Sequence, residues 1–228
     1  MLDRGVIATA DADIYLYRAQ LRPRQDKQGR ERDIHSGLEL APNSIYGHRL
    51  RAELELENGD SAAAIATLSK IVDNPDITAS PMPALIQRGV IQLKNGKPSL
   101  AQADFERAHA AAKTAAELND VAWELARLNV ALPTALSIAR EAVAKQPGTV
   151  VFIDSEAFIL LRLGRYKEAI ERYDAVLAIS PKLPAALFGR GIAKRRMGRS
   201  SAGDADLNAA RAIFAAIDSR FSQFGVVP

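Results

Sequence analysis

The sequence predicts an all-α protein, built as a solenoid of about six helix-turn-helix repeats with a short C-terminal capping helix. Three observations lead to this fold class. Apolar residues recur at three- and four-residue spacing, small residues and turn glycines return at a constant period, and Val- and Thr-rich runs of strand length do not occur. Aromatic residues make up only 6% of the 228 residues while alanine is abundant, which favours close helix packing over a sheet.

Residues 150–183 show the repeating unit most clearly. In the first half, Ala157 and Leu160 belong to the apolar stripe of a buried helix face. Gly164 then supplies the left-handed residue at which a helix commonly ends. The same period restarts after it, and Pro181 stops the second helix.

The other repeats are found by sliding this unit along the chain by its own length. The last four share one register without a gap, whereas the second carries three extra residues in the loop 76–81. The first is the least regular, because Arg30 stands where the others have Ala or Gly. The predicted repeats are 11–44, 45–81, 82–115, 116–149, 150–183 and 184–217.

This pattern resembles the tetratricopeptide repeat family, and the resemblance covers residues 11–217. Small residues such as Gly89 and Gly191 occupy the eighth position, and Pro181 occupies the thirty-second; Trp123 departs from the small-residue rule. The resemblance implies a right-handed superhelix in which the first helix of each repeat lines a concave surface. That surface would take an extended peptide or a helix of a partner protein.

Two ends lie outside the repeats. Residues 1–10 resemble the middle of a second helix, so we expect them to be the end of a truncated preceding repeat. Residues 218–228 are expected to form a C-terminal cap and tail, in which Phe221 and Phe224 cover the exposed face of the last repeat.

The residues that carry chemistry do not form a recognisable catalytic or metal site. His35, His48 and His109 are isolated, the carboxylates are scattered, and no phosphate-binding glycine motif or nucleophile elbow occurs. The absence of Cys excludes thiolate chemistry but does not distinguish cytoplasm from periplasm. A net charge of +3 is weak for nucleic-acid binding, and no apolar run is long enough to span a membrane. We therefore expect a non-enzymatic, soluble protein without cofactor or metal.

Candidate binding residues follow from the family's inward positions, the fifth and ninth of each repeat. Carried over one by one, they are Tyr15, Arg49, Glu53, Ile86, Val90, Asp120, Glu124, Asp154, Phe158, Phe188 and Ile192. The middle of this expected groove is acidic and its C-terminal half is apolar. The hypothesis is a partner segment with a basic residue beside apolar ones.

Alternatives remain open at this point. The groove phenylalanines could instead fill a tightly wound interior or meet the terminal helix. The chain could be the regulatory C-terminal repeat region of a larger bacterial envelope protein, which the array and its tail resemble. A helical repeat that binds nucleic acid is a third possibility, which the acidic centre of the groove disfavours.

Overall fold

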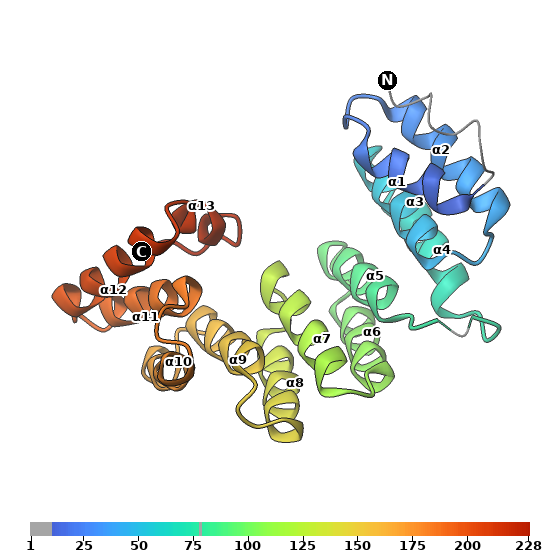
Figure 1. Cartoon of the computed structure of the whole chain (residues 1–228). Coiled ribbons are helices and arrows are strands. Elements are labelled where there is room, and N and C mark those ends of the chain that lie inside the picture. Colours follow the sequence, from blue (N-terminus) through green and yellow to red (C-terminus); the bar gives the residue numbers. More distant parts are fainter. Residues whose placement is uncertain (1–10, 78) are drawn as a thin grey trace. The chain divides into compact units, whose positions relative to one another are not determined.

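The computed structural model describes residues 11–77 and 79–228, and this part of the chain contains thirteen α-helices and no strand (Figure 1). The all-α prediction is confirmed. The segment 1–10, expected to end a truncated repeat, lies outside the described residues.

The chain divides into two compact units, the first ending at Ala111 and the second starting at Ala112. Unit 1 holds three helix hairpins: α1 (Ala12–Leu21), α2 (Lys27–Leu40), α3 (Ile45–Glu57), α4 (Ser61–Val72), α5 (Met82–Lys94) and α6 (Pro98–Ala111). Unit 2 holds three more and a short last helix: α7 (Ala115–Leu128), α8 (Leu132–Lys145), α9 (Val150–Arg162), α10 (Tyr166–Ile179), α11 (Pro184–Arg196), α12 (Ser200–Ile213) and α13 (Ile217–Ser222).

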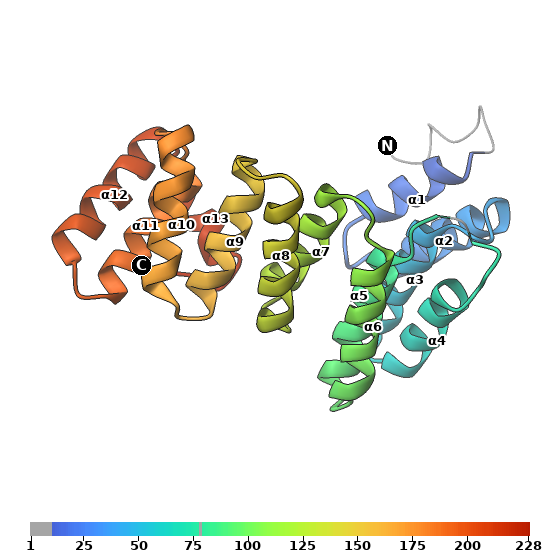
Figure 2. The same ribbon diagram turned by 90° about the horizontal axis from the view of Figure 1, so that it is seen from below.

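Hairpins stack on their neighbours within each unit, as Figures 1 and 2 show for α9 to α12. In unit 2, α9 packs against α10, α10 against the following α11, and α9 also against α11. No hairpin can bury its apolar face alone, so each depends on the next one. This stacking and the short α13 confirm the predicted helical-repeat solenoid within each unit, while the repeat boundaries stay a prediction.

The turns inside the hairpins use the predicted glycines. Gly164 has φ +73° and Gly198 has φ +76°, the left-handed conformation that glycine adopts without a steric cost. The amide of Arg165 then donates to the carbonyl of Leu160 at 2.9 Å, which closes the helix end.

Close approach of helices depends on small side chains. A Cβ atom at Gly203 of α12 would lie 2.7 Å from the carbonyl oxygen of Gly191 in α11, so these two backbones touch. In the preceding hairpin the equivalent residues are Ala157 and Ala169, which are both fully buried.

Ion pairs also hold hairpins together. Arg88 of α5 forms two hydrogen bonds with the buried carboxylate of Asp104 in α6, at 2.7 and 2.9 Å. Arg190 of α11 contacts Asp206 of α12 in the same bidentate way, at 2.7 Å for both bonds. These pairs lie between the two helices of a hairpin, away from the first helix's concave positions.

Candidate functional site

The register of α7 determines which of its side chains reach the site. The second helices α6, α8, α10 and α12 begin at a constant spacing, at positions 98, 132, 166 and 200. The first helices α9 and α11 begin at positions 150 and 184 and keep the same spacing, but α7 begins at Ala115, one position earlier than that spacing requires. Each residue of an α-helix turns by about 100° around the axis. A start one residue early therefore means that the residues facing the site in α7 are those one position before the ones aligned by the constant spacing.

Local interactions explain this shift. The side chains and backbones of Thr114 and Glu117 form a capping box that starts α7 at Ala115. At the other end, Asn129 takes the left-handed conformation (φ 57°) one position earlier than Gly164 does in α9. Ala131, also left-handed at φ 45°, is the additional residue that restores the spacing before α8.

The shift corrects the assignment of the inward residues of α7. Ala122, which is fully buried, takes the place of the small residue, and Trp123 therefore does not break that rule. Asn119 and Trp123, rather than Asp120 and Glu124, are the structural equivalents of Asp154 and Phe158 in α9. Sequence comparison at fixed spacing could not find them, although the misfit of Trp123 was a signal.

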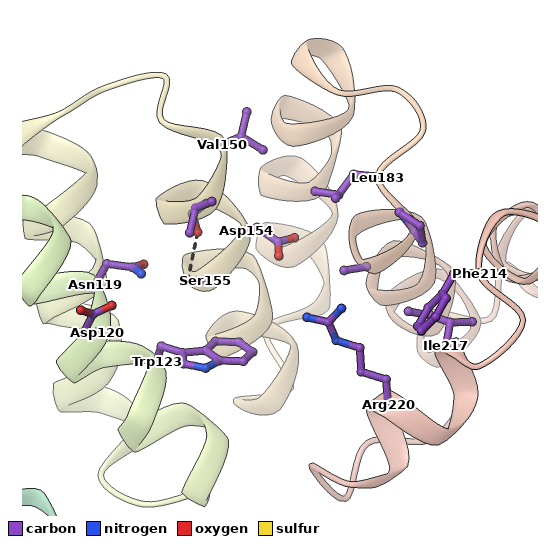
Figure 3. Close-up of a pocket in the computed structure, with 13 residues that line it drawn as sticks. Asn119, Asp120, Trp123, Val150, Asp154, Ser155, Leu183, Phe214, Ile217 and Arg220 are labelled. Atoms are coloured by element: carbon purple, nitrogen blue, oxygen red, sulfur yellow. Dashed lines mark hydrogen bonds between the residues drawn. The ribbon is translucent and has the colours of Figure 1, made fainter. Parts of the chain in front are cut away.

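A pocket of about 670 Å³ lies on this side of unit 2. Figure 3 shows Asn119, Asp120 and Trp123 of α7 on one wall, Arg220 of α13 on the opposite wall, and Asp154 between them. Apolar residues complete the lining, and two of them are well exposed, Val151 at 61% and Phe214 at 40%. The other apolar lining residues are Val150, Leu183, Pro184, Ala185 and Ile217.

The floor of the pocket carries acceptor atoms that the protein does not satisfy. Within residues 11–77 and 79–228, the Oδ1 atoms of Asn119 and Asp154 are buried and have no hydrogen-bond partner. Asn119 as a whole is only 6% exposed. Buried polar atoms without a partner are uncommon, and a water, an ion or a ligand is the kind of partner that they need.

Burial also changes the acid–base properties of these groups. Desolvation raises the pKa of Asp154 to about 6, against a smaller lowering by the positive charge of Arg220. Desolvation, followed by the negative charges of Glu124 and Glu117, raises the pKa of Asp120. The pocket thus holds two carboxylates that gain from a cation.

The apolar candidates of unit 2 lie beneath α13. Phe158, Phe188 and Ile192 are buried. The ring of Phe221 lies 4.8 Å from that of Phe188 and 6.0 Å from that of Phe158, measured between centroids. The terminal helix therefore meets the groove phenylalanines, which the sequence had left as an alternative.

The remaining candidates are placed separately. Glu124 pairs with Arg127 on the surface of α7, at 2.6 Å. In unit 1, Arg49 donates to Gln87 at 3.2 Å, and the ring of Tyr15 lies beneath the guanidinium of Arg18. Also in unit 1, Glu53 is exposed, Ile86 is buried and Val90 is half-buried.

The described residues were also compared with the requirements of a metal site and of a membrane span. They meet neither requirement. They contain no group of three or more His, Cys, Asp or Glu side chains placed to hold a metal ion. None of their helices combines the length and apolarity needed to cross a membrane.

Comparison with known proteins finds similar sequences and a matching repeat. The profile of the TPR repeat matches residues 159–198. Tetratricopeptide repeat protein 37 of Xenopus laevis is 28% identical over 167 residues, which are 73% of this chain and 11% of that protein. Superkiller complex protein 3 of Mus musculus is 28% identical over 154 residues, 68% of this chain and 10% of that protein. The chain thus spans about a tenth of the length of these relatives.

A solved structure shows the same fold. The crystal structure of a tetratricopeptide repeat protein from Parabacteroides merdae has a TM-score of 0.57 and 15% identity, covering 99% of this chain and 88% of that one. With the stacked helix hairpins and the matching repeat profile, this likeness leads to one conclusion. The chain has the fold of tetratricopeptide repeat proteins, and its residues 159–198 match the TPR repeat.

Proposed function

We propose that the chain is a non-catalytic protein-interaction scaffold, and that the pocket of unit 2 binds a partner segment in which a basic residue lies beside apolar ones. The observation that carries the proposal is the pair of buried acceptors, Asn119 Oδ1 and Asp154 Oδ1, that lack hydrogen-bond partners among the described residues. A guanidinium or ammonium group supplies the donors and the positive charge that such a floor requires.

The walls fit the rest of such a side chain. The indole of Trp123 lies beside the two carboxylates, so it can pack on the aliphatic part of Arg or Lys and attract its cation. Asp120 at the exposed edge adds long-range attraction, which speeds the encounter more than it strengthens the complex.

In this proposal the apolar contacts come from the exposed rim of the pocket, formed by Val151 and Phe214. Because α13 covers Phe158 and Phe188, the exposed Val151 and Phe214 are the surfaces open to a neighbouring apolar residue. The sequence-based hypothesis therefore keeps its acidic part at Asp154 and shifts its apolar anchor to the rim.

Phosphate-rich ligands do not suit this pocket. Asp120 and Asp154 would repel a nucleic-acid backbone, and the exposed Arg220 supplies a single opposing charge on the far wall. A protein or peptide partner agrees better with the charges at hand.

A peptide series tests the proposal. Fluorescein-labelled heptapeptides with Leu and Phe around a central Arg, Lys, Met or Glu would be titrated with the full chain. We expect the Arg and Lys peptides to bind more tightly than the Met peptide, and the Glu peptide to bind most weakly. Asp154→Asn should weaken the Arg peptide about tenfold or more, because a charge-assisted hydrogen bond contributes roughly 1.5–3 kcal/mol.

A matched control removes one negative charge elsewhere. Glu171 is exposed on α10 and is not part of the pocket lining, so Glu171→Gln should leave the affinity of the Arg peptide unchanged. Equal affinity of the wild-type chain for the Arg and Glu peptides would contradict the proposal.

A further inference from the structure

The C-terminal segment of the chain occupies part of the concave side of unit 2. Phe221 of α13 contacts Phe158 and Phe188, as described above, and the ring of Phe224 lies 5.6 Å from Trp123 and 5.8 Å from Phe158. We name the surface formed by Trp123, Phe158 and Phe188 the aromatic face. It is built from α7, α9 and α11, and the two phenylalanines of the C-terminal segment lie on it.

Polar contacts fasten the same segment. Arg162 of α9 donates to the carbonyl oxygen of Phe224 at 2.5 Å and to the side chain of Asn129 at 3.1 Å. Arg196 of α11 donates to the carbonyl oxygen of Val227 at 3.3 Å. Both arginines bind main-chain carbonyls, so this fastening does not depend on the side chains of the segment and would suit another segment of similar backbone.

The segment has the chemistry proposed above for a partner. Arg220, a basic residue, precedes Phe221 at the end of α13, and Phe224 lies in the turn that follows; both rings contact Phe158. The Arg220 side chain extends into the pocket from the wall opposite Asp120 (Figure 3). A basic residue and apolar residues thus already lie together in this groove.

The conformation of α13 depends on that docking. A helix of six residues is far below the length at which a helix persists in water by itself, and no side chain in the described part of the protein caps its N-terminus. Contacts with the aromatic face therefore help to hold it, together with the two hydrogen bonds from Arg211 of α12 to the carboxylate of Asp218 at 2.7 and 2.8 Å, and a competing segment that takes the aromatic contacts weakens its docking.

We propose that α13 and the residues after it are a displaceable intramolecular ligand of the aromatic face, and that the partner of unit 2 presents a short helix and the turn after it, with two aromatic residues three positions apart behind a basic one. The inference rests on the proposed function, since it names the partner's motif and the segment that competes with it. A fixed cap, the role predicted for residues 218–228 from the sequence, is the alternative.

A synthetic peptide of residues 214–228 is the probe. In the wild-type chain the tethered segment competes at an effective concentration in the millimolar range, so the labelled peptide should bind weakly. In a full chain carrying Phe221→Ala and Phe224→Ala the face is free, and the peptide should bind at least tenfold more tightly. A peptide with the same two substitutions should bind neither chain.

Fluorescence gives an independent readout, because Trp123 is the single tryptophan of the chain and contacts Phe224. Loss of that contact in the double variant should shift its emission to longer wavelength. Addition of the wild-type peptide should reverse the shift, and the substituted peptide should not.

A second variant covers the case in which the double variant loses helicity by circular dichroism. Phe224→Ala alone keeps Phe221 and all of α13 and removes the ring contacts with Trp123 and Phe158 from the tethered segment only, so the wild-type peptide should bind this chain more tightly than it binds the wild-type chain. A folded variant that binds the peptide no better than the wild-type chain overturns the inference. So does equal binding of the substituted peptide.

Failure of this inference and failure of the proposed function would give different results. If α13 is a fixed cap, the Arg heptapeptide still binds and still depends on Asp154. If the proposed pocket is wrong, the heptapeptides show no charge preference while the 214–228 peptide still binds the double variant.

Discussion

Glu156 of α9 faces Arg172 of α10 at 3.3 Å, with the acid and the base exchanged relative to the Arg88–Asp104 pair in unit 1. In α7 and α8 the equivalent residues are Val121 and Ile138, and both are almost fully buried. The fold therefore accepts three solutions at one place between the helices of a hairpin. In each of the three, a buried charge is either paired across the hairpin or absent.

The first prediction concerns that pairing. Asp104→Ala should lower the free energy of unfolding by about 3–5 kcal/mol, because it leaves the Arg88 guanidinium buried without its main partner. The double substitution Arg88→Val with Asp104→Ile copies the apolar pair of the α7–α8 hairpin and should lie within about 1–2 kcal/mol of the wild type. Urea unfolding of the three chains checks this. A double variant as unstable as the sum of the single variants would count against it.

The second prediction concerns pH. The Asp154 carboxyl has its pKa raised to about 6 in the folded chain, from 3.8 in the unfolded one, so its contribution to stability is full below pH 3.8 and is lost as the pH rises through 6. Asp154→Asn should therefore be stabilising at pH 8, by at most about 3 kcal/mol, and this gain should shrink towards pH 4. Urea unfolding at several pH values measures the difference.

Other groups around Asp154 define the controls for this experiment. Arg220 offsets part of the effect, and Asp120 is the second acid of the pocket. The Tyr173 hydroxyl is buried, which raises its pKa further above the range of the experiment. The exposed control Glu171→Gln should show no such trend between pH 4 and 8. A gain from Asp154→Asn that does not change with pH would contradict the assignment.

The third prediction concerns helix contact. Gly203→Ala should cost about 1–3 kcal/mol, because the new methyl group would meet the carbonyl oxygen of Gly191 at 2.7 Å and α11 and α12 would have to separate. Ala169→Gly, at the equivalent position of α10, should cost only about 1 kcal/mol, the difference in helix propensity. Thermal unfolding ranks the two. An equal or smaller loss for Gly203→Ala would show that the helices can move apart freely.

The fourth prediction is an Ala→Gly substitution that should raise the stability, whereas this substitution usually lowers it. Ala131→Gly should stabilise unit 2 by about 1 kcal/mol, because Ala131 has φ 45° and a left-handed conformation costs a residue with a Cβ roughly 1–2 kcal/mol. Calorimetry on the full chain measures the shift. Ala122→Gly, in the interior of α7, is the comparison and should be destabilising.

Much of the fold could be predicted from the sequence, because its information is local and repeated. The left-handed glycines, such as Gly164, and the small residues at helix contacts follow from spacing alone. The candidate site was predicted less well. Asp154 was found because α9 keeps the register, whereas Asn119 and Trp123 were missed because a capping box and an early left-handed turn move α7 by one residue.

The position of α13 could not be predicted for a different reason. Periodicity describes how repeats contact each other, but it gives no information about a segment outside the repeats. Phe221 and Phe224 were expected to cover the last repeat, and a contact of the terminal helix with the groove phenylalanines was one open alternative; the two rings contact α7, α9 and α11.

The displacement of α7 also bears on how such proteins diversify. A one-residue deletion before a helix and a one-residue insertion after it leave the spacing of all later repeats unchanged. The stacked repeats therefore tolerate the two changes together, although either change alone would shift every later helix. The helix between them turns a new set of side chains towards the ligand. The ligand-facing residues of one repeat can then change while its packing contacts with the neighbouring repeats stay the same.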